Sequence, residues 1–181
     1  MKLRPGQELI DKPIISLNEG RFLGNLKGLL LDRELTRIVG LFMGRKGLLK
    51  RKTQLIPLSD VQILGIDAIL VKKSSSLVDE DAHPEAKEWL RLDELRGRPV
   101  NTPGGTRVGL VGDILLADSS RIVGFGLSAV YVEGPIKENR GVMHSAVIDV
   151  GLTDGVMTVN MERAEQDRPD NLDLTSKESE E

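Results

Sequence analysis

The chain has 181 residues, with 25 Lys and Arg against 28 Asp and Glu, a formal net charge of -3 and no cysteine. The missing cysteines exclude a disulfide framework and a thiolate metal site. No apolar run approaches the ~20 residues of a membrane-spanning helix, and the first residues lack the apolar core of a signal peptide, so we expect a cytoplasmic protein.

The charge is distributed unevenly along the chain. Residues 1–73 hold 14 of the 25 Lys and Arg but only 7 of the 28 Asp and Glu. The first part is therefore basic and the remainder acidic, partly because residues 162–181 are rich in carboxylates. This asymmetry predicts different neighbours for the two parts.

The first part is predicted to form short strands separated by turn residues. The expected strands are 13–17, 22–31, 36–43, 53–56 and 68–71. Gly24 and Gly28 inside the second strand would permit the bends that a small closed barrel needs. A helix over residues 29–41 is the competing interpretation, because Leu, Glu and Arg are good helix formers. The short apolar runs and Gly40 favour strands.

Residues 74–92 are the expected linker. It begins with three serines and an acidic stretch, and residues 84–92 are its helix candidate. Pro84 suits a first helical turn, and Trp89 and Leu90 offer an apolar edge.

Residues 93–161 are predicted to repeat the strand-rich pattern. The expected strands are 107–116, 121–132, 141–149 and 156–159, with a hairpin turn at 102–106. Residues 133–139 form a loop in this prediction. Residues 162–181 are charged and poor in apolar residues, which is typical of a disordered acidic tail.

An internal repeat organises these elements. The tetrapeptide Arg-Ile-Val-Gly occurs at residues 37–40 and again at 121–124. Further anchors recur in the same order: Glu8-Leu9 with Glu94-Leu95, Pro13 with Pro99, Gly24 with Gly109, Asp32 with Asp118, and Gly65 with Gly151. We therefore expect a duplicated domain, with a first repeat at 1–73 and a second repeat at 93–161.

Two features of the first repeat resemble the PRC-barrel family. They are the glycine-punctuated strand before Arg-Ile-Val-Gly and the run Ile-Pro-Leu-Ser-Asp-Val at 56–61 with Gly65. The resemblance covers about 7–71 well and about 93–159 less well, because His-Ser-Ala-Val replaces the second motif at 144–147. It implies an all-β chain of two tandem six-stranded antiparallel barrels. The family includes the cytoplasmic domain of the photosynthetic reaction-centre H subunit and a domain of the ribosome-maturation factor RimM, so it also implies a binding or scaffold module.

No catalytic, cofactor or metal site is predicted. His83 lies among linker carboxylates that we expect to remain solvated, and His144 is placed on a strand whose next residue, Ser145, would face the opposite way. Gly104-Gly105 precedes no Lys-Ser/Thr pair and is better explained as a hairpin turn. Asp32 and Asp118 are expected to cap turns.

The strongest functional candidate is a basic, partly apolar segment in the first repeat. Its binding residues would be Arg45, Lys46, Leu48, Leu49, Lys50, Arg51 and Lys52. Cations around an exposed apolar pair suit an anionic membrane surface. They also suit RNA phosphates, although no aromatic residue accompanies them to stack a base. A solvated hairpin without a partner is the third interpretation.

These observations lead to a functional hypothesis. The chain is expected to be a non-enzymatic scaffold or adaptor that binds a protein partner and works peripherally at the cytoplasmic face of a membrane. The alternative is a RimM-like adaptor in ribosome or RNA maturation. The sequence leaves the partner and the oligomeric state open.

Overall fold

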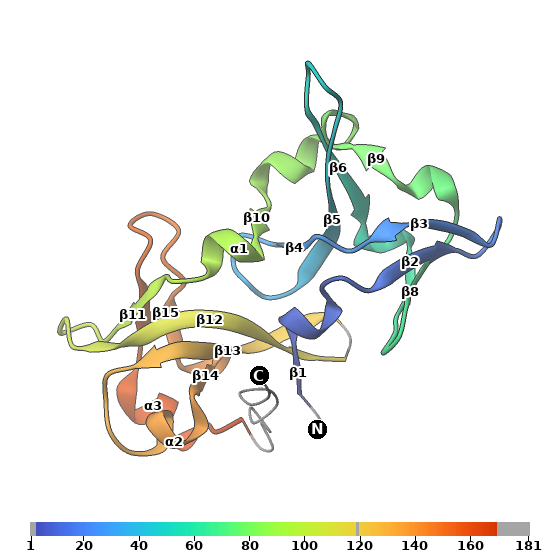
Figure 1. Ribbon diagram of the computed structural model, residues 1–181. Coiled ribbons are helices and arrows are strands. Elements are labelled where there is room, and N and C mark those ends of the chain that lie inside the picture. The colour runs from blue at the N-terminus through green and yellow to red at the C-terminus, as the bar shows by residue number, and fades with distance from the viewer. Residues whose placement is uncertain (1–2, 119, 170–181) are drawn as a thin grey trace, which may run out of the picture.

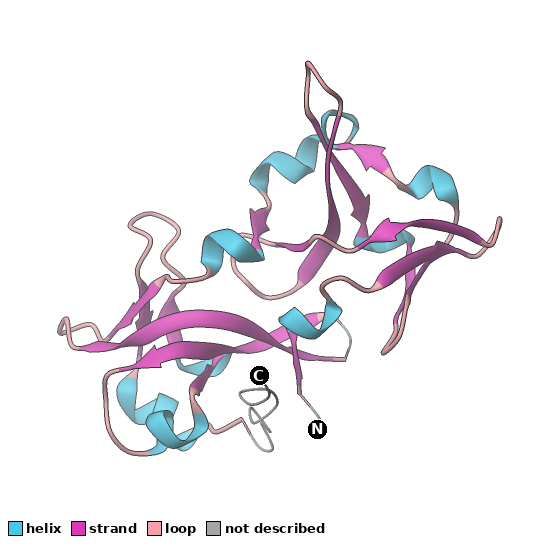
Figure 2. Ribbon diagram, viewed as in Figure 1, coloured by secondary structure: helices cyan, strands magenta, loops and turns pink. Residues whose placement is uncertain are grey.

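The computed structural model describes residues 3–118 and 120–169, and these are mostly β-structure, as predicted (Figures 1 and 2). The strands of the first repeat are β1 (Arg4–Pro5), β2 (Pro13–Ser16), β3 (Arg21–Asn25), β4 (Gly28–Leu31), β5 (Ile38–Lys46), β6 (Lys52–Pro57), β7 (Val61–Leu64) and β8 (Ile69–Val71). The remaining strands are β9 (Val78–Asp79), β10 (Leu90–Arg91), β11 (Pro99–Asn101), β12 (Arg107–Ala117), β13 (Arg121–Val130), β14 (Gly141–Met143), β15 (Val147–Asp149) and β16 (Met157–Val159). The described residues add three short helices, α1 (Leu92–Leu95), α2 (Pro135–Asn139) and α3 (Met161–Gln166).

The strands form three sheets. The first repeat contributes to two of them, in the orders β10-β4-β5-β6-β9 and β3-β2-β8-β7. The second repeat forms the third sheet, in the order β14-β13-β12-β11-β16-β15, with β1 pairing to β12. Within the described residues no sheet closes on itself, so the prediction of closed six-stranded barrels is not confirmed.

The strand predicted at 22–31 is wrong as a single element. It divides into β3 and β4, and the buried Leu26 between them bonds instead to the two residues just before β2. Its N–H donates to the Lys12 carbonyl at 2.9 Å, and its carbonyl accepts from Asp11 N–H at 2.9 Å. Gly24, at a φ of 128°, permits this bend. The helical alternative at 29–41 is also wrong, because β4 and β5 pair antiparallel across this region.

The second repeat follows the same order of elements, with one long strand in place of two. β12 runs unbroken over 11 residues, as predicted, and pairs antiparallel with β13. The strand predicted at 141–149 is wrong as a unit, because a 3-10 turn at His144–Ala146 separates β14 from β15. The first repeat has its own 3-10 turn at Leu58–Asp60, in the corresponding position. The loop predicted at 133–139 contains α2.

The linker lies along the first repeat instead of hanging free. After a 3-10 turn at Ser74–Ser76, β9 pairs antiparallel with β6. The helix predicted at 84–92 is confirmed only over its first residues, as a 3-10 helix at Pro84–Glu88, and β10 then extends to pair with β4. Pairing with the edge of β4 satisfies backbone N–H and C=O groups of β10, which a longer helix would have satisfied by hydrogen bonds within itself.

The start of the predicted acidic tail is also corrected. Residues 161–166 form α3, capped by Asn160, whose side chain accepts from Arg163 N–H at 2.9 Å. Ala164 on this helix is buried. Residues 170–181 lie outside the described residues, so the tail prediction is not assessed there.

The two copies of Arg-Ile-Val-Gly meet at their first residues. Arg37 and Arg121 lie opposite each other in an isolated antiparallel bridge. Two corresponding hydrogen bonds flank this bridge, from Ile38 N–H to the Ser120 carbonyl at 2.9 Å and from Ile122 N–H to the Thr36 carbonyl at 2.8 Å. The repeated motif therefore joins the repeats through a reciprocal, approximately two-fold contact.

The repeats also exchange their first strands. β1 lies at the start of the first repeat but pairs with β12 of the second, whereas β10 lies in the linker just before the second repeat and pairs with β4 of the first (Figure 1). One hydrophobic cluster consequently contains fully buried residues of both repeats, among them Leu9, Ile14, Leu41, Val108, Phe125 and Val142. Because this core is shared, we infer that the repeats fold as one unit.

Candidate functional site

The predicted basic segment forms a hairpin that projects from the body of the molecule at the top of Figure 1. β5 and β6 pair up to the tip, where Lys46 lies opposite Lys52. Gly47 turns the chain at a φ of 110°, and a Cβ at this position would lie 2.5 Å from the Lys50 carbonyl oxygen. Only glycine fits such a turn without strain, so Gly47 itself determines the conformation of the tip.

Both leucines at the tip are turned to solvent. Leu48 is 99% exposed and Leu49 is 100% exposed, which makes them the most exposed large apolar residues described. Single exposed apolar residues are common on protein surfaces. Two adjacent, fully exposed leucines on a projecting hairpin can remove their apolar surface from water only by contacting another molecule or a membrane.

Exposed cations surround the leucine pair on both strands. They are Arg45, Lys46, Lys50, Arg51 and Lys52. Lys52 Nζ lies 3.6 Å from Asp79 Oδ2 on β9, whereas the other four cations form no ion pair within the described residues. The structure therefore brings all seven predicted residues together on one tip and leaves four charges available to an external anion.

The base of the hairpin is firmly supported. The Arg91 guanidinium lies 4.8 Å from the centre of the Phe42 ring, and a Cβ at Gly28 would lie 3.2 Å from the same ring. Lys27 N–H donates to the Phe42 carbonyl at 3.0 Å. A fixed base carrying an exposed tip is suited to present the leucines without reorganising the body.

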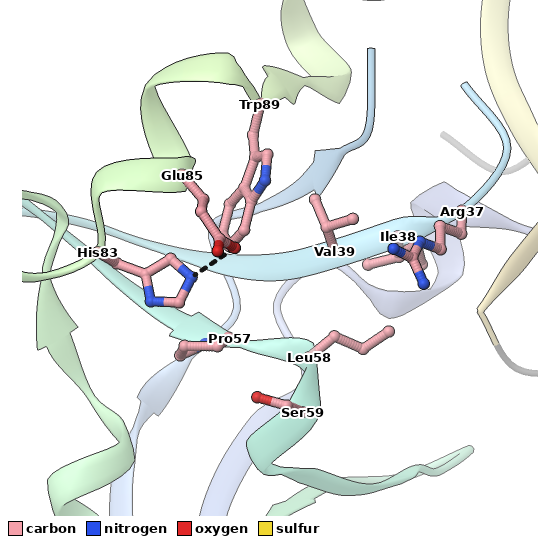
Figure 3. Close-up of a pocket in the computed structure, with 9 residues that line it drawn as sticks. All are labelled: Arg37, Ile38, Val39, Pro57, Leu58, Ser59, His83, Glu85 and Trp89. Atoms are coloured by element: carbon pink, nitrogen blue, oxygen red, sulfur yellow. Dashed lines mark ion pairs between the residues drawn. The ribbon is translucent and has the colours of Figure 1, made fainter. Parts of the chain in front are cut away.

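A groove that the sequence did not predict lies over the first copy of the repeated motif (Figure 3). Its volume is about 410 Å³, and its two sides are residues 37–39 and 57–59. His83, Glu85 and Trp89 of the linker lie across it, with the His83 and Trp89 rings 5.0 Å apart and His83 Nε2 3.8 Å from Glu85 Oε2. The Glu85 side chain remains 82% exposed, in agreement with the prediction that the linker carboxylates stay solvated, whereas His83 packs on the Trp89 ring.

A second groove occupies the corresponding place in the second repeat. Its volume is about 610 Å³, with residues 121–123 and 143–145 as its sides. Against prediction, His144 and Ser145 lie on a 3-10 turn and not on a strand. His144 Nε2 is 3.2 Å from the Glu34 carbonyl and Ser145 Oγ donates to Asp167 at 2.5 Å, so the two side chains bond to different partners instead of to each other.

Other predicted positions have structural roles. Asp32 Oδ1 accepts from Thr36 N–H at 2.7 Å and from Arg37 N–H at 3.0 Å, which caps the turn before β5. Across the described part of the chain, no group of three or more His, Asp or Glu side chains is placed to hold a metal ion. None of the helices described there has the length and hydropathy to cross a bilayer.

Residues 1–78 match the family model of the PRC-barrel domain. The PRC-barrel match thus covers the first repeat and continues to Val78 at the start of β9, which completes the β10-β4-β5-β6-β9 sheet. It contains the entire basic hairpin. No curated protein matches the chain.

Proposed function

We propose that this chain is a non-enzymatic adaptor built from two PRC-type units, which docks peripherally on the cytoplasmic face of a membrane through the β5–β6 hairpin and holds a protein partner there. The observation that carries the proposal is the exposed Leu48–Leu49 pair between exposed cations. The second PRC-type unit is supported by the recurrence of Arg-Ile-Val-Gly and of the 3-10 turn before the last two strands.

The energetics of the tip suit reversible membrane binding. Burying a leucine side chain fully is worth about 1.5–3 kcal/mol, and each cation near an anionic leaflet adds about 1 kcal/mol. Interfacial insertion would realise part of each contribution, because the headgroup region is only partly apolar. A few kcal/mol gives attachment that can be reversed, as expected of a peripheral adaptor.

The leucines also favour a lipid surface over nucleic acid as the ligand of the tip. RNA-binding surfaces combine cations with aromatic side chains on which bases stack. This tip has aliphatic side chains in that position, and the nearest aromatic on its strands, Phe42, packs at the base against Arg91. The RimM-like alternative therefore has only the positive charge in its favour.

Liposome co-sedimentation tests the proposal. The protein should pellet with vesicles of phosphatidylcholine containing about a third phosphatidylserine and remain in solution with phosphatidylcholine alone. The variant Leu48→Ser/Leu49→Ser should bind the anionic vesicles about tenfold more weakly, and Lys50→Glu/Arg51→Glu should abolish binding. These changes leave the Lys52–Asp79 ion pair in place.

The matched control is Ile66→Ser, which removes another aliphatic side chain, 81% exposed, from outside the hairpin. It should pellet like the unmodified protein. Equal pelleting of the leucine variant would show that the apolar pair does not insert. The chain could instead bind single-stranded RNA with an affinity that depends on the cations but not on the leucines, and fail to pellet with vesicles. That result would identify nucleic acid, and not a membrane, as the ligand of the hairpin.

A further inference from the structure

One face of the sheet β3-β2-β8-β7, at the right of Figure 1, packs against the core of the molecule. Ile14, Ile69 and Val71 point to this side, are fully buried and belong to the hydrophobic cluster that both repeats share. Successive residues of a strand point to opposite faces, so Ile15 and Leu70 point away from the core. Neither belongs to any hydrophobic cluster among the described residues.

A continuous row of apolar residues crosses this outer face. Backbone pairing places its four members side by side, in the order Phe22, Ile15, Leu70 and Ile63. The two at the sheet edges are the most open, with Phe22 59% exposed and Ile63 53% exposed. Leu17, just after β2, is 51% exposed. Apolar side chains on neighbouring strands that face solvent together form a patch, in contrast to single scattered exposures.

The second repeat shows that the framework does not require an apolar row. The same pairings in its sheet place side by side, in the same order, Arg107, Asn101, Thr158 and Asp149. The pairing register shifts just before Ile15 in one repeat and just before Asn101 in the other, so the two rows correspond residue by residue. Polar residues are usual on a sheet face that is turned to water. The apolar row of the first repeat therefore indicates a contact with another molecule.

The charges near the row do not favour a charged ligand. Residues 13–25 and 61–71, which form this sheet and its turns, contain Glu19, Arg21 and Asp67 as their charged residues. Beside the sheet, Lys72 Nζ lies 4.0 Å from Asp60 Oδ1, so these two charges offset each other. Anionic lipid and nucleic acid require a surplus of cations. A nearly neutral apolar face is instead complementary to a second copy of itself, which it can meet without like-charge repulsion.

The size of the patch suits a reversible dimer. A large side chain presents about 150–250 Å² when fully exposed, so Phe22, Ile63 and Leu17 together leave on the order of 300 Å² of apolar surface in water. A standard interface buries about 800 Å² on each partner, of which somewhat more than half is apolar. The row is therefore large enough for the apolar centre of a small interface, and a small interface dissociates readily.

We propose that the chain self-associates through this face, as a two-fold dimer in which the β3-β2-β8-β7 sheets of two copies pack on each other. The apolar rows of the two copies interdigitate with the sheets about 10 Å apart, as the inner faces of a β-sandwich do. The proposal does not depend on membrane binding, because the basic hairpin belongs to the other sheet of the first repeat.

Sedimentation velocity of the full chain, at concentrations from about 1 to 300 µM, tests the proposal. The sedimentation coefficient should rise with concentration towards that of a dimer, with a midpoint in the micromolar range. Phe22→Arg and Ile63→Asp each introduce the residue type that the second repeat has at the corresponding position, and each should weaken self-association about tenfold or more. Both side chains are exposed, so thermal unfolding followed by circular dichroism should show that both variants fold like the unmodified chain.

The matched control is Ile148→Arg, which changes an isoleucine of the second repeat that is also 58% exposed and lies on β15. It should associate like the unmodified protein. Equal association by both row variants would overturn the proposal. A chain that stays monomeric at every concentration would also overturn it, and the face would then belong to a different protein or to residues 170–181.

Two further comparisons separate the sheet face from the hairpin. Self-association that is lost in Leu48→Ser/Leu49→Ser but kept in both row variants would place the contact on the hairpin and overturn the proposal. The row variants should pellet with anionic vesicles as the unmodified protein does. A monomeric chain whose pelleting is lost in the row variants would assign the face to lipid instead of a second copy.

Discussion

The two repeats share a framework and differ in the surfaces placed on it. In the first repeat, β5 and β6 extend into a basic tip with two exposed leucines. In the second repeat, the corresponding strands β13 and β14 are joined through α2, where Lys137 Nζ is paired with Glu133 at 2.7 Å. The linker residues His83, Glu85 and Trp89 line the first groove. In the second groove, Val123 and Met143 pack instead against Leu3, the residue before β1.

This difference shows which positions of the duplicated unit are constrained. Arg37 and Arg121, the first residues of the two motif copies, pair through their backbones, and both grooves lie beside this contact. The hairpin tip lies away from the contact, so its sequence can differ between the repeats without disturbing the shared core. A duplicated unit of this kind can therefore keep one framework and carry different surfaces on it.

The largest expected effect is a loss of stability when a side chain in the hydrophobic core shared by the two repeats is truncated. Leu41 and Phe125 are fully buried, lie in corresponding strands and belong to the same hydrophobic cluster. Leu41→Ala or Phe125→Ala should each lower the free energy of unfolding by about 2–5 kcal/mol. For Phe125→Ala, Trp89 fluorescence, which reports on the linker and first repeat, should lose its native signal at the same denaturant concentration as the circular dichroism of the whole chain. A fluorescence midpoint that stays unchanged while circular dichroism shifts would show that the repeats unfold independently.

The stability of the protein should depend on pH through Asp113, a carboxylate of the second repeat that has no counterpart in the first. Asp113 on β12 accepts hydrogen bonds from Gln7 N–H at 3.0 Å and Ile114 N–H at 2.8 Å, and burial raises the pKa of its carboxyl above the usual 3.8. The unfolded chain therefore loses this proton at lower pH than the folded chain does. As the pH rises from about 3 to 7, the stability of the protein relative to Asp113→Asn should fall through the interval between the two pKa values.

Urea unfolding of both proteins across this pH range measures the difference, because the asparagine does not titrate. A difference that is constant with pH, or that rises, would contradict the assigned direction of the pKa shift. The first repeat has no carboxylate here, because Gly28 occupies the corresponding position.

The smallest expected effect compares the two turn aspartates. Asp32→Ala removes the acceptor of two backbone N–H groups and should cost about 1 kcal/mol. Asp118 bonds the exposed Arg121 side chain, and its φ of 49° suits asparagine. Asp118→Asn should therefore change stability by less than about 0.5 kcal/mol. Thermal unfolding of the two variants provides the comparison, and an equal loss in both would show that the two turns are energetically equivalent.

Local sequence features predicted much of this protein. Strand-forming runs and turn residues correctly indicated the mostly β fold, and the basic segment predicted at 45–52 lies together on the β5–β6 hairpin. The repeated tetrapeptide indicated the duplication. These signals succeed because turns, strand propensity and exposed charge depend on nearby residues.

Other features depended on contacts that no local pattern encodes. The break at Leu26 follows from its bonds to the residues just before β2, and the early end of the helix predicted at 84–92 follows from the pairing of β10 with β4. The same holds for the exchange of β1 and β10 and for the two grooves. The sequence determined the parts and their repetition, whereas the tertiary structure decided which repeat each short strand joins. The physical reason is that unpaired sheet edges and apolar faces are satisfied by whichever segment the fold brings beside them.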